Sequence, residues 1–434
     1  MASSATSTTP LLPRLEEDPA LLAVMRQRSD TFSNIVRKQL GREHPHAHLR
    51  ADEVKGPLSF FNPTAATFDL VPASKLSTGP ASGIAPQGPL PTGARLAWRA
   101  RDNRKGRHVL VIPSNDGATD APAFSTSWSH IRRILWRMCT VYAWWDVSWW
   151  IAVLFSWGSA LFLICGFFYW LPLAAPSTEF PNESSIGGGL TAFIGATMFT
   201  VGGVLLVVEA SNEHQTGCFG WAVENLFTHS DSDTEPGSRP PPDGKFTIRQ
   251  EACTHHHATG AHSSAALHLQ HPEAGRRWEW CPTWQEFRRH YIFEIGFMAS
   301  FVLAIGAVIF YVSGIMALPW IYDKISQPVL YGTYWLAYLG GGILFVVSSA
   351  LYMLETQPKW YLPAPRVLGW WIGTFNMIGS VGWTLSAAFG YCTASWCEYQ
   401  SDLSLLWASL AFLMGSLLLW YEAMDKYPVI RASG

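Results

Sequence analysis

Six apolar segments, each long enough to cross a bilayer, constrain this chain more than any other feature of its sequence. They cover residues 148–171, 187–210, 291–316, 330–354, 367–390 and 403–422. A transmembrane helix needs about 20 mainly apolar residues. Charged residues make up only 14% of the chain, and its 22 tryptophans suit the boundary between water and lipid. We therefore expect an all-α membrane protein whose six transmembrane helices form three repeated antiparallel hairpins.

The polar sequence between these segments divides the chain into five parts. Residues 1–130 are rich in Ser, Pro, Gly, Thr and Ala, which predicts a mostly disordered cytoplasmic N-terminal tail. The first hairpin then covers 131–221, a flexible His-rich loop 222–285, the second hairpin 286–360, and the third hairpin with a short C-terminal tail 361–434. The first 30 residues hold no apolar run after a basic stretch. We therefore expect no cleaved signal peptide and an uncleaved anchor in the first span.

Basic residues fall almost entirely on one side of the expected spans. That side holds Arg132, Arg133, Arg137, Arg276, Arg277, Arg288, Arg289, Lys359, Arg366, Lys426 and Arg431. The other side holds only Lys324 near the span ends. The positive-inside rule then places both termini, and the 222–285 loop, in the cytoplasm of a membrane whose identity stays open.

Two cysteines, Cys392 and Cys397, fall in the last non-cytoplasmic connection of this topology. That side is oxidising in the secretory pathway, where disulfides form and persist. A disulfide between them and a pair of free thiols are both compatible with the sequence.

The second, fourth and sixth spans share a pattern of small residues and a phenylalanine that ends in glutamate. At identical offsets they carry Gly195, Phe199, Gly202, Gly203 and Glu209; Gly341, Phe345, Ser348, Ser349 and Glu355; and Ala408, Phe412, Gly415, Ser416 and Glu422. The recurrence indicates triplication. Small residues seven positions apart lie on one helical face and let a neighbouring helix approach closely, so we expect them to form the helix-packing contacts.

The terminal glutamates of these three spans need a separate explanation. A carboxylate at a helix C-terminus opposes the helix dipole, at a cost of about 0.3–1 kcal/mol. Its recurrence suggests a cationic partner for each of Glu209, Glu355 and Glu422. The candidates at the same membrane face are Arg137, Arg288, Arg289 and Arg366. The alternative is that headgroup water solvates all three carboxylates.

Polar groups within the spans are few, which disfavours a proton-coupled transporter. Asn376 lies about one-third into the fifth span, where it would form a hydrogen bond between helices or contact a solute. Outside the spans, His255, His256 and His257 stand near Cys253. These are zinc and copper ligands by type, but their spacing fits no known zinc module, so we favour a low-complexity tract without a metal.

Several short motifs resemble those of a known family. They are LETQPKWYLP at 354–363, GWWIGTFN at 369–376, WYE at 420–422, GATMF at 195–199 and CFGW at 218–221. Together they resemble a family of fungal multi-pass integral membrane proteins with hairpins similar to the YrhK-like domain. The resemblance covers about 140–428. It implies a fungal source and a helical membrane fold, and it supplies no catalytic residue.

The sequence carries no motif for an enzyme. HExxH, GxSxG and Walker patterns are absent, and a net charge of −2 indicates no nucleic-acid partner. We expect a non-enzymatic membrane scaffold or assembly factor without a cofactor, whose protein partners bind the N-terminal tail and the 222–285 loop. One alternative is a channel or transporter for a small solute. A second alternative is a metal-handling membrane protein that uses the His-rich loop.

Overall fold

The computed structural model describes most of the chain from residue 48 onward. The described residues are 48–69, 93–112, 124–213, 215–220, 222–223, 246–247 and 277–432. They belong to one compact unit, His46–Gly434. The His tract at 255–257 lies outside them, so the metal hypothesis for that tract is a matter for experiment.

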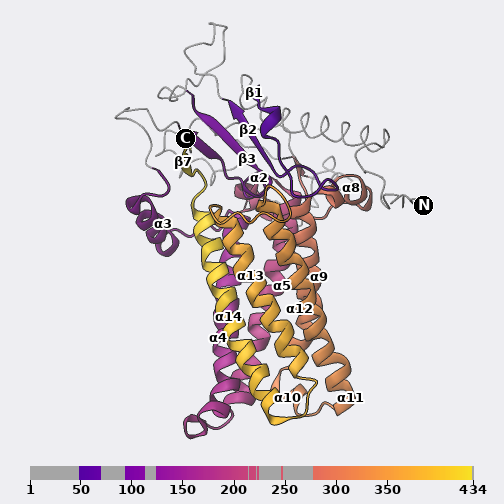
Figure 1. The fold of residues 1–434 in the computed structure, drawn as a ribbon. Helices are drawn as coiled ribbons and strands as arrows, with labels where there is room; N and C mark the ends of the chain where they lie inside the picture. Colours follow the sequence, from indigo (N-terminus) through magenta and orange to yellow (C-terminus); the bar gives the residue numbers. More distant parts are fainter. Residues whose placement is uncertain are drawn as a thin grey trace, which may run out of the picture. The chain divides into compact units, whose positions relative to one another are not determined.

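Among the described residues, five helices are long and apolar enough to cross a membrane (Figure 1). They are α4 (Val147–Ala174), α5 (Gly189–Ser211) with the preceding η4 (Glu183–Gly188), α9 (Ile295–Met316), α12 (Leu336–Thr356) with the preceding α11 (Gln327–Val329) and η8 (Leu330–Trp335), and α14 (Ser395–Met424). The fifth predicted span is helix α13 (Leu368–Phe389). It has no charged residue, but its glycines, serines, tryptophans and Asn376 make its most apolar stretch less apolar than those of the other five.

These six long helices pack in chain order into a closed ring. Each helix contacts the next in the sequence α4, α5, α9, α12, α13 and α14, and α14 packs back against α4. The inside of the ring is filled by an aromatic layer, which comprises Phe162, Phe199, Phe310, Phe345, Trp383 and Phe412. The fully buried Trp383 ring has its centroid 4.5 to 6.1 Å from those of the other five. Aromatic contacts of this kind close the axis of the ring at this level.

A five-stranded sheet lies at one end of the helices, which we call the sheet end (Figure 1). Its order is β1 (His48–Leu49), β2 (Ala65–Asp69), β3 (Arg95–Arg99), β4 (Val109–Ile112) and β7 (Val429–Arg431). β7 pairs with β4 in parallel, and the other pairs are antiparallel. Phe68, Leu96, Leu110 and Val429 form one buried row across four strands.

The sheet corrects the expectation of a disordered tail over 1–130 and of a purely α fold. Residues 48–69 and 93–112 supply four of the five strands. Their apolar residues alternate, as in the buried Ala66 and Phe68 of β2, but the strands are short and are separated by segments rich in Pro, Gly and Ser. The composition averaged over residues 1–130 therefore does not reveal these short strands. The last strand comes from the expected C-terminal tail, a pairing that no local pattern indicates.

The end of the 222–285 loop is also folded. β6 (Arg277–Trp278) pairs with β5 (Phe246–Thr247), and α8 (Trp284–Arg289) follows. The Trp278 side chain is fully buried. Asn212, directly after α5, donates from its amide to the Glu279 carbonyl at 2.6 Å and accepts from the Glu279 N–H at 2.7 Å. These contacts correct the prediction of a flexible loop for residues 277–285.

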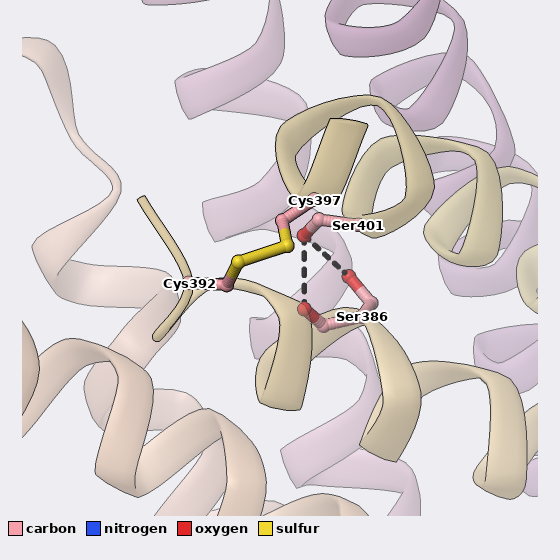
Figure 2. Close-up of a disulfide and its surroundings, with 4 residues drawn as sticks. All are labelled: Ser386, Cys392, Cys397 and Ser401. Atoms are coloured by element: carbon pink, nitrogen blue, oxygen red, sulfur yellow. Dashed lines mark hydrogen bonds between the residues drawn. A yellow bond between two sulfur atoms is a disulfide. The ribbon is translucent and has the colours of Figure 1, made fainter. Parts of the chain in front are cut away.

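A disulfide joins the connection after α13 to the first turn of α14 at the far end of the helices, opposite the sheet. Cys392 and Cys397 are bonded, with their Cα atoms 5.9 Å apart (Figure 2). Beside them, the Ser401 hydroxyl donates to the Ser386 carbonyl at 2.9 Å. Closing so short a loop stabilises the folded chain by about 2 kcal/mol in the chain-entropy model.

We expect alkylation to reveal this bond. Of the seven cysteines, the purified chain denatured without reductant should take up two fewer alkyl groups than the chain denatured with reductant. Intact-mass spectrometry measures the difference directly. Equal uptake in both samples would contradict the disulfide. A Cys392→Ser, Cys397→Ser variant should show equal uptake and serves as the control.

Candidate functional site

A strongly charged turn between β3 and β4 projects from the sheet into the ring of helices. We call residues 99–107, Arg-Ala-Arg-Asp-Asn-Arg-Lys-Gly-Arg, the basic tip; they include the short helix α2 (Ala100–Arg104). Gly106 has φ of 60°, a left-handed conformation that suits glycine and returns the chain to β4. Four cations of the basic tip are buried, and these are Arg101, Arg104, Lys105 and Arg107.

Three buried carboxylates meet the basic tip. Glu209, Glu355 and Glu422, which we call the glutamate triad, lie in the last turns of α5, α12 and α14. At most 3% of the surface of each of these three residues is exposed. Because these helices end at the sheet end, the triad forms one acidic cluster from three separate segments of sequence.

Two arginines bind the triad in two-point contacts. Arg101 donates to Glu422 from Nε at 2.9 Å and from Nη2 at 2.7 Å. Arg104 donates to both oxygens of Glu355, from Nη2 at 3.0 Å and from Nη1. Such bidentate pairs are the strongest and most directional ion pairs that proteins form.

Lys105 and Arg107 complete the cluster. The Lys105 ammonium lies 3.4 Å from a Glu209 oxygen. Arg107 Nη1 bridges Asp102 at 2.8 Å and Glu422 at 3.2 Å. Four cations thus face four carboxylates. Burying a charge is costly unless it is paired, and removing one member of a buried pair typically costs about 3–5 kcal/mol. The basic tip and the triad therefore depend on each other.

The pKa values of the tip reflect this pairing. Burial alone lowers the pKa of Arg101, but the carboxylates of Glu422 and then Glu355 together outweigh burial and raise it. The pKa of Arg104 is raised in the same way, chiefly by Glu355. Burial lowers the pKa of Lys105, and the more distant Glu209 does not fully compensate. The two arginines are the firmly charged members of the cluster.

Small residues at the starts of three helices make room for the cluster. Each is the second residue of its helix, namely Ser148 in α4, Gly296 in α9 and Gly369 in α13. The Ser148 hydroxyl donates to Glu209. A Cβ on Gly296 would lie 1.7 Å from Arg104 Nη1, and one on Gly369 would lie 2.6 Å from Arg101 Nε. Larger side chains at these glycines are incompatible with the observed ion pairs.

Further polar contacts hold the backbone and rim of the basic tip. Lys426, after α14, donates to the Lys105 carbonyl at 2.8 Å and pairs with Asp146 at 2.6 Å. The Asn103 amide donates to Glu213 at 2.8 Å. Burial, followed by the nearby Glu294, raises the pKa of Glu213 well above its usual value. The tip is thus anchored on several sides and not through its charges alone.

The cluster corrects the predicted ion-pair partners. The expectation that Glu209, Glu355 and Glu422 have cationic partners agrees with the structure, but Arg137, Arg288, Arg289 and Arg366 are not those partners among the described residues. The prediction considered only arginines close to the spans in sequence. The missed signal is the basic tip itself, with six charged residues among nine in a chain that is only 14% charged.

A cavity of about 50 Å³ lies between the basic tip and the aromatic layer, and we call it the axial cavity. Its walls are mainly apolar, with Phe155, Leu206 and Leu303 among them, and Arg104 and Asn376 add polar groups. Arg104 Nε faces no hydrogen-bond acceptor, its nearest carboxylate oxygen being 3.7 Å away on Glu209. A space of this size has room for a few water molecules.

Asn376 lines this cavity and does not bridge two helices by a side-chain hydrogen bond in the described part of the chain. Its Oδ1 lies where it would be 2.6 Å from a Cβ on Gly415. Of the two predicted roles, contact with whatever occupies the cavity is therefore the one that its position allows.

The predicted packing residues lie at helix contacts, and two of the nine receive aromatic rings. Cβ atoms on Gly195 and Gly202 would meet the rings of Phe162 and Phe155 at 3.0 and 3.2 Å. The remaining members meet backbone, small side chains or apolar groups: Gly203 at Ala307, Gly341 at Phe310, Ala408 at Gly382, Gly415 at Phe375, Ser348 at the Ala299 carbonyl, Ser349 at Ser380 and Ser416 at Ser159. The small size of these residues thus makes room for the large side chains of a neighbouring helix as well as for its backbone.

Comparison with known proteins adds no assignment to this geometry. No family model, curated protein or solved structure matches the chain. Within the described residues, no group of three or more His, Cys, Asp or Glu is placed to hold a metal ion. The site is therefore interpreted from its contacts alone, as a charge cluster that fixes the sheet to the helices and closes the axial cavity.

We predict that Gly296→Ala destabilises the protein because its methyl group would displace Arg104 from Glu355. The free energy of unfolding should fall, but by less than the about 3–5 kcal/mol that removal of one partner of a buried pair costs, because both partners stay in the chain. Thermal unfolding of the detergent-solubilised chain measures this. Gly340→Ala in α12 is the matched control, since its Cβ would have no neighbour closer than 3.7 Å. Equal melting temperatures for the two variants would contradict the role of the cluster.

Proposed function

We propose that this chain is a six-span integral membrane protein of three repeated hairpins, which serves as a non-enzymatic scaffold or assembly factor. Helix α13 has span length, carries no charge and packs between α12 and α14, which supports its counting as the sixth span. The resemblance to fungal membrane proteins with YrhK-like hairpins belongs to the same proposal. With an even number of spans, the basic segments and both termini would share the cytoplasmic side.

Equivalent contacts support the repeat. Ser148, Gly296 and Gly369 occupy equivalent positions at the starts of the odd-numbered spans. The residues ten positions later are Gly158, Gly306 and Gly379. A Cβ on each glycine would contact the phenylalanine of the following span, Phe199, Phe345 or Phe412, at 2.8, 3.3 and 2.6 Å. On this alignment the counterpart of Gly158 in the third span is Gly306.

The observation that carries the scaffold proposal is that aromatic side chains fill the axis of the ring and buried ion pairs fix the sheet to one end of the helices. The aromatic layer fills the middle of the ring, and the basic tip covers the axial cavity at the sheet end. A rigid domain clamped to a packed membrane bundle is a suitable platform for other proteins. We propose that partners bind on this side, through the sheet, the N-terminal segment and the 222–285 loop.

A small-solute channel is the second candidate, and the axial cavity is the observation that favours it. The cavity lies on the axis of the ring, and Asn376 is available to a polar solute there. Conduction would require both the basic tip and the aromatic layer to move. The buried ion pairs oppose that movement, so we rank this function second.

Reconstitution into liposomes tests the two proposals together. For a scaffold, we expect uptake of small neutral solutes such as urea and glycerol, followed by light scattering, to equal that of empty liposomes. A chain in which short Gly/Ser linkers replace 224–245 and 248–276 should stay folded, because the linkers leave room for the turn between β5 and β6. It should lose a stoichiometric partner that the full chain retains in mild detergent. Solute uptake above background that Asn376→Leu abolishes would contradict the scaffold proposal and establish the channel.

A further inference from the structure

Helix α3 (Trp128–Thr140) lies beside the sheet-end terminus of α14 (Figure 1). Ser127 caps its first turn by accepting from the His130 N–H. On one side Ile134 is buried in a cluster with Trp149 of α4 and Met424 of α14. On the same side His130 Nε2 lies 3.2 Å from Asp425, which directly follows α14. These contacts fix α3 at the level where two candidate spans begin or end.

The opposite side of α3 exposes large apolar side chains around Arg132. Trp128 and Trp136 are 72% and 70% exposed, and Leu135 is 46% exposed. These residues, with the exposed Cys139, share one face because positions three, four, seven and eleven apart lie together on a helix. Tyr142, 70% exposed, continues this surface into the connection to α4. Large aromatic side chains left uncovered at such a level are typical of a membrane interface.

Basic residues accompany this apolar surface. Arg132 and Arg133 are exposed, and neither has an ion-pair partner among the described residues. Their long side chains can lay apolar stems on the lipid and place the guanidinium groups among phosphates. Helix α3 itself has no acidic residue. Its charge is therefore complementary to an anionic lipid surface.

We propose that α3 is an interfacial helix that lies in the cytoplasmic surface of the bilayer and binds anionic lipid headgroups through Arg132 and Arg133. This inference rests on the proposed membrane embedding of the spans. The surface is continuous with the lipid-facing sides of α4 and α14, because α3 packs against the sheet ends of both. A bilayer that surrounds the spans therefore reaches the exposed face of α3 without any movement of the chain.

Spin labels on the full-length protein test the proposal. In a Cys253→Ser, Cys281→Ser background, a label on Cys139 reports on the apolar face, since the remaining free cysteines, Cys165 and Cys218, are buried. In vesicles of phosphatidylcholine and phosphatidylserine, we expect this label to collide with oxygen and to lie roughly 5–10 Å inside the headgroup boundary. A label at Asp52→Cys, with Cys139→Ser, is the control, because this exposed residue follows the edge strand β1 of the sheet and is not part of α3. It should collide with a water-soluble nickel chelate.

The remaining outcomes decide against the proposal or its premise. A Cys139 label as open to the chelate as the Asp52→Cys label would overturn the interfacial helix, and a label shielded from both reagents would assign the face to a protein partner. A third label, at the exposed Val308→Cys in α9, tests the membrane embedding of the spans separately from the position of α3. If it too meets the chelate, the membrane embedding itself fails. If it meets only oxygen, a negative result at Cys139 concerns α3 alone.

The lipid charge is tested with the same label. Omitting phosphatidylserine, or introducing Arg132→Gln and Arg133→Gln, should reduce the depth of the Cys139 label, and high salt should do the same in anionic vesicles. A depth that is identical in neutral and anionic vesicles would overturn the role of anionic headgroups.

Discussion

The buried ion pairs between the basic tip and the glutamate triad are the interaction on which the rest of this structure depends. Each carboxylate ends a different helix, and all the matching cations come from one turn between two strands. A single insertion therefore gathers the ends of α5, α12 and α14 and orients the sheet. The same constraint accounts for Gly296 and Gly369, the second residues of α9 and α13, because a side chain at either position would occupy the space of a guanidinium group.

The physical logic of the bundle changes along its axis. Helices in lipid gain little from apolar burial against one another, so their association relies on close packing and polar contacts. In the middle, small residues and the aromatic layer supply close packing. At the sheet end, charges replace it, and the disulfide constrains the far end. The axial cavity lies between the aromatic layer and the charge cluster. Its walls are therefore mainly apolar, and the basic tip lines its sheet end.

The sequence predicted the helices well and the site only in part. Runs of apolar residues report local burial in lipid, so the helix positions agree with the structure, although α14 begins at Ser395 and not near 403. Of the two explanations for the recurrence of Glu209, Glu355 and Glu422, the structure shows cationic partners and not solvation by headgroup water. Those partners come from a tip more than 100 residues away from each glutamate in sequence, inside a segment whose composition is typical of disorder. Such long-range pairing leaves no local pattern beyond the density of charge in residues 99–107.

Hydrogen–deuterium exchange of the full-length chain in detergent tests the central claim most directly. If the basic tip is locked into the bundle, amides in 99–107 should exchange as slowly as those at the sheet ends of α5 and α12, and Glu422→Gln should release them while the middle of the spans stays protected. Complete exchange of 99–107 within seconds in the unaltered chain, beside protected spans, would contradict the account and return this segment to the disordered tail.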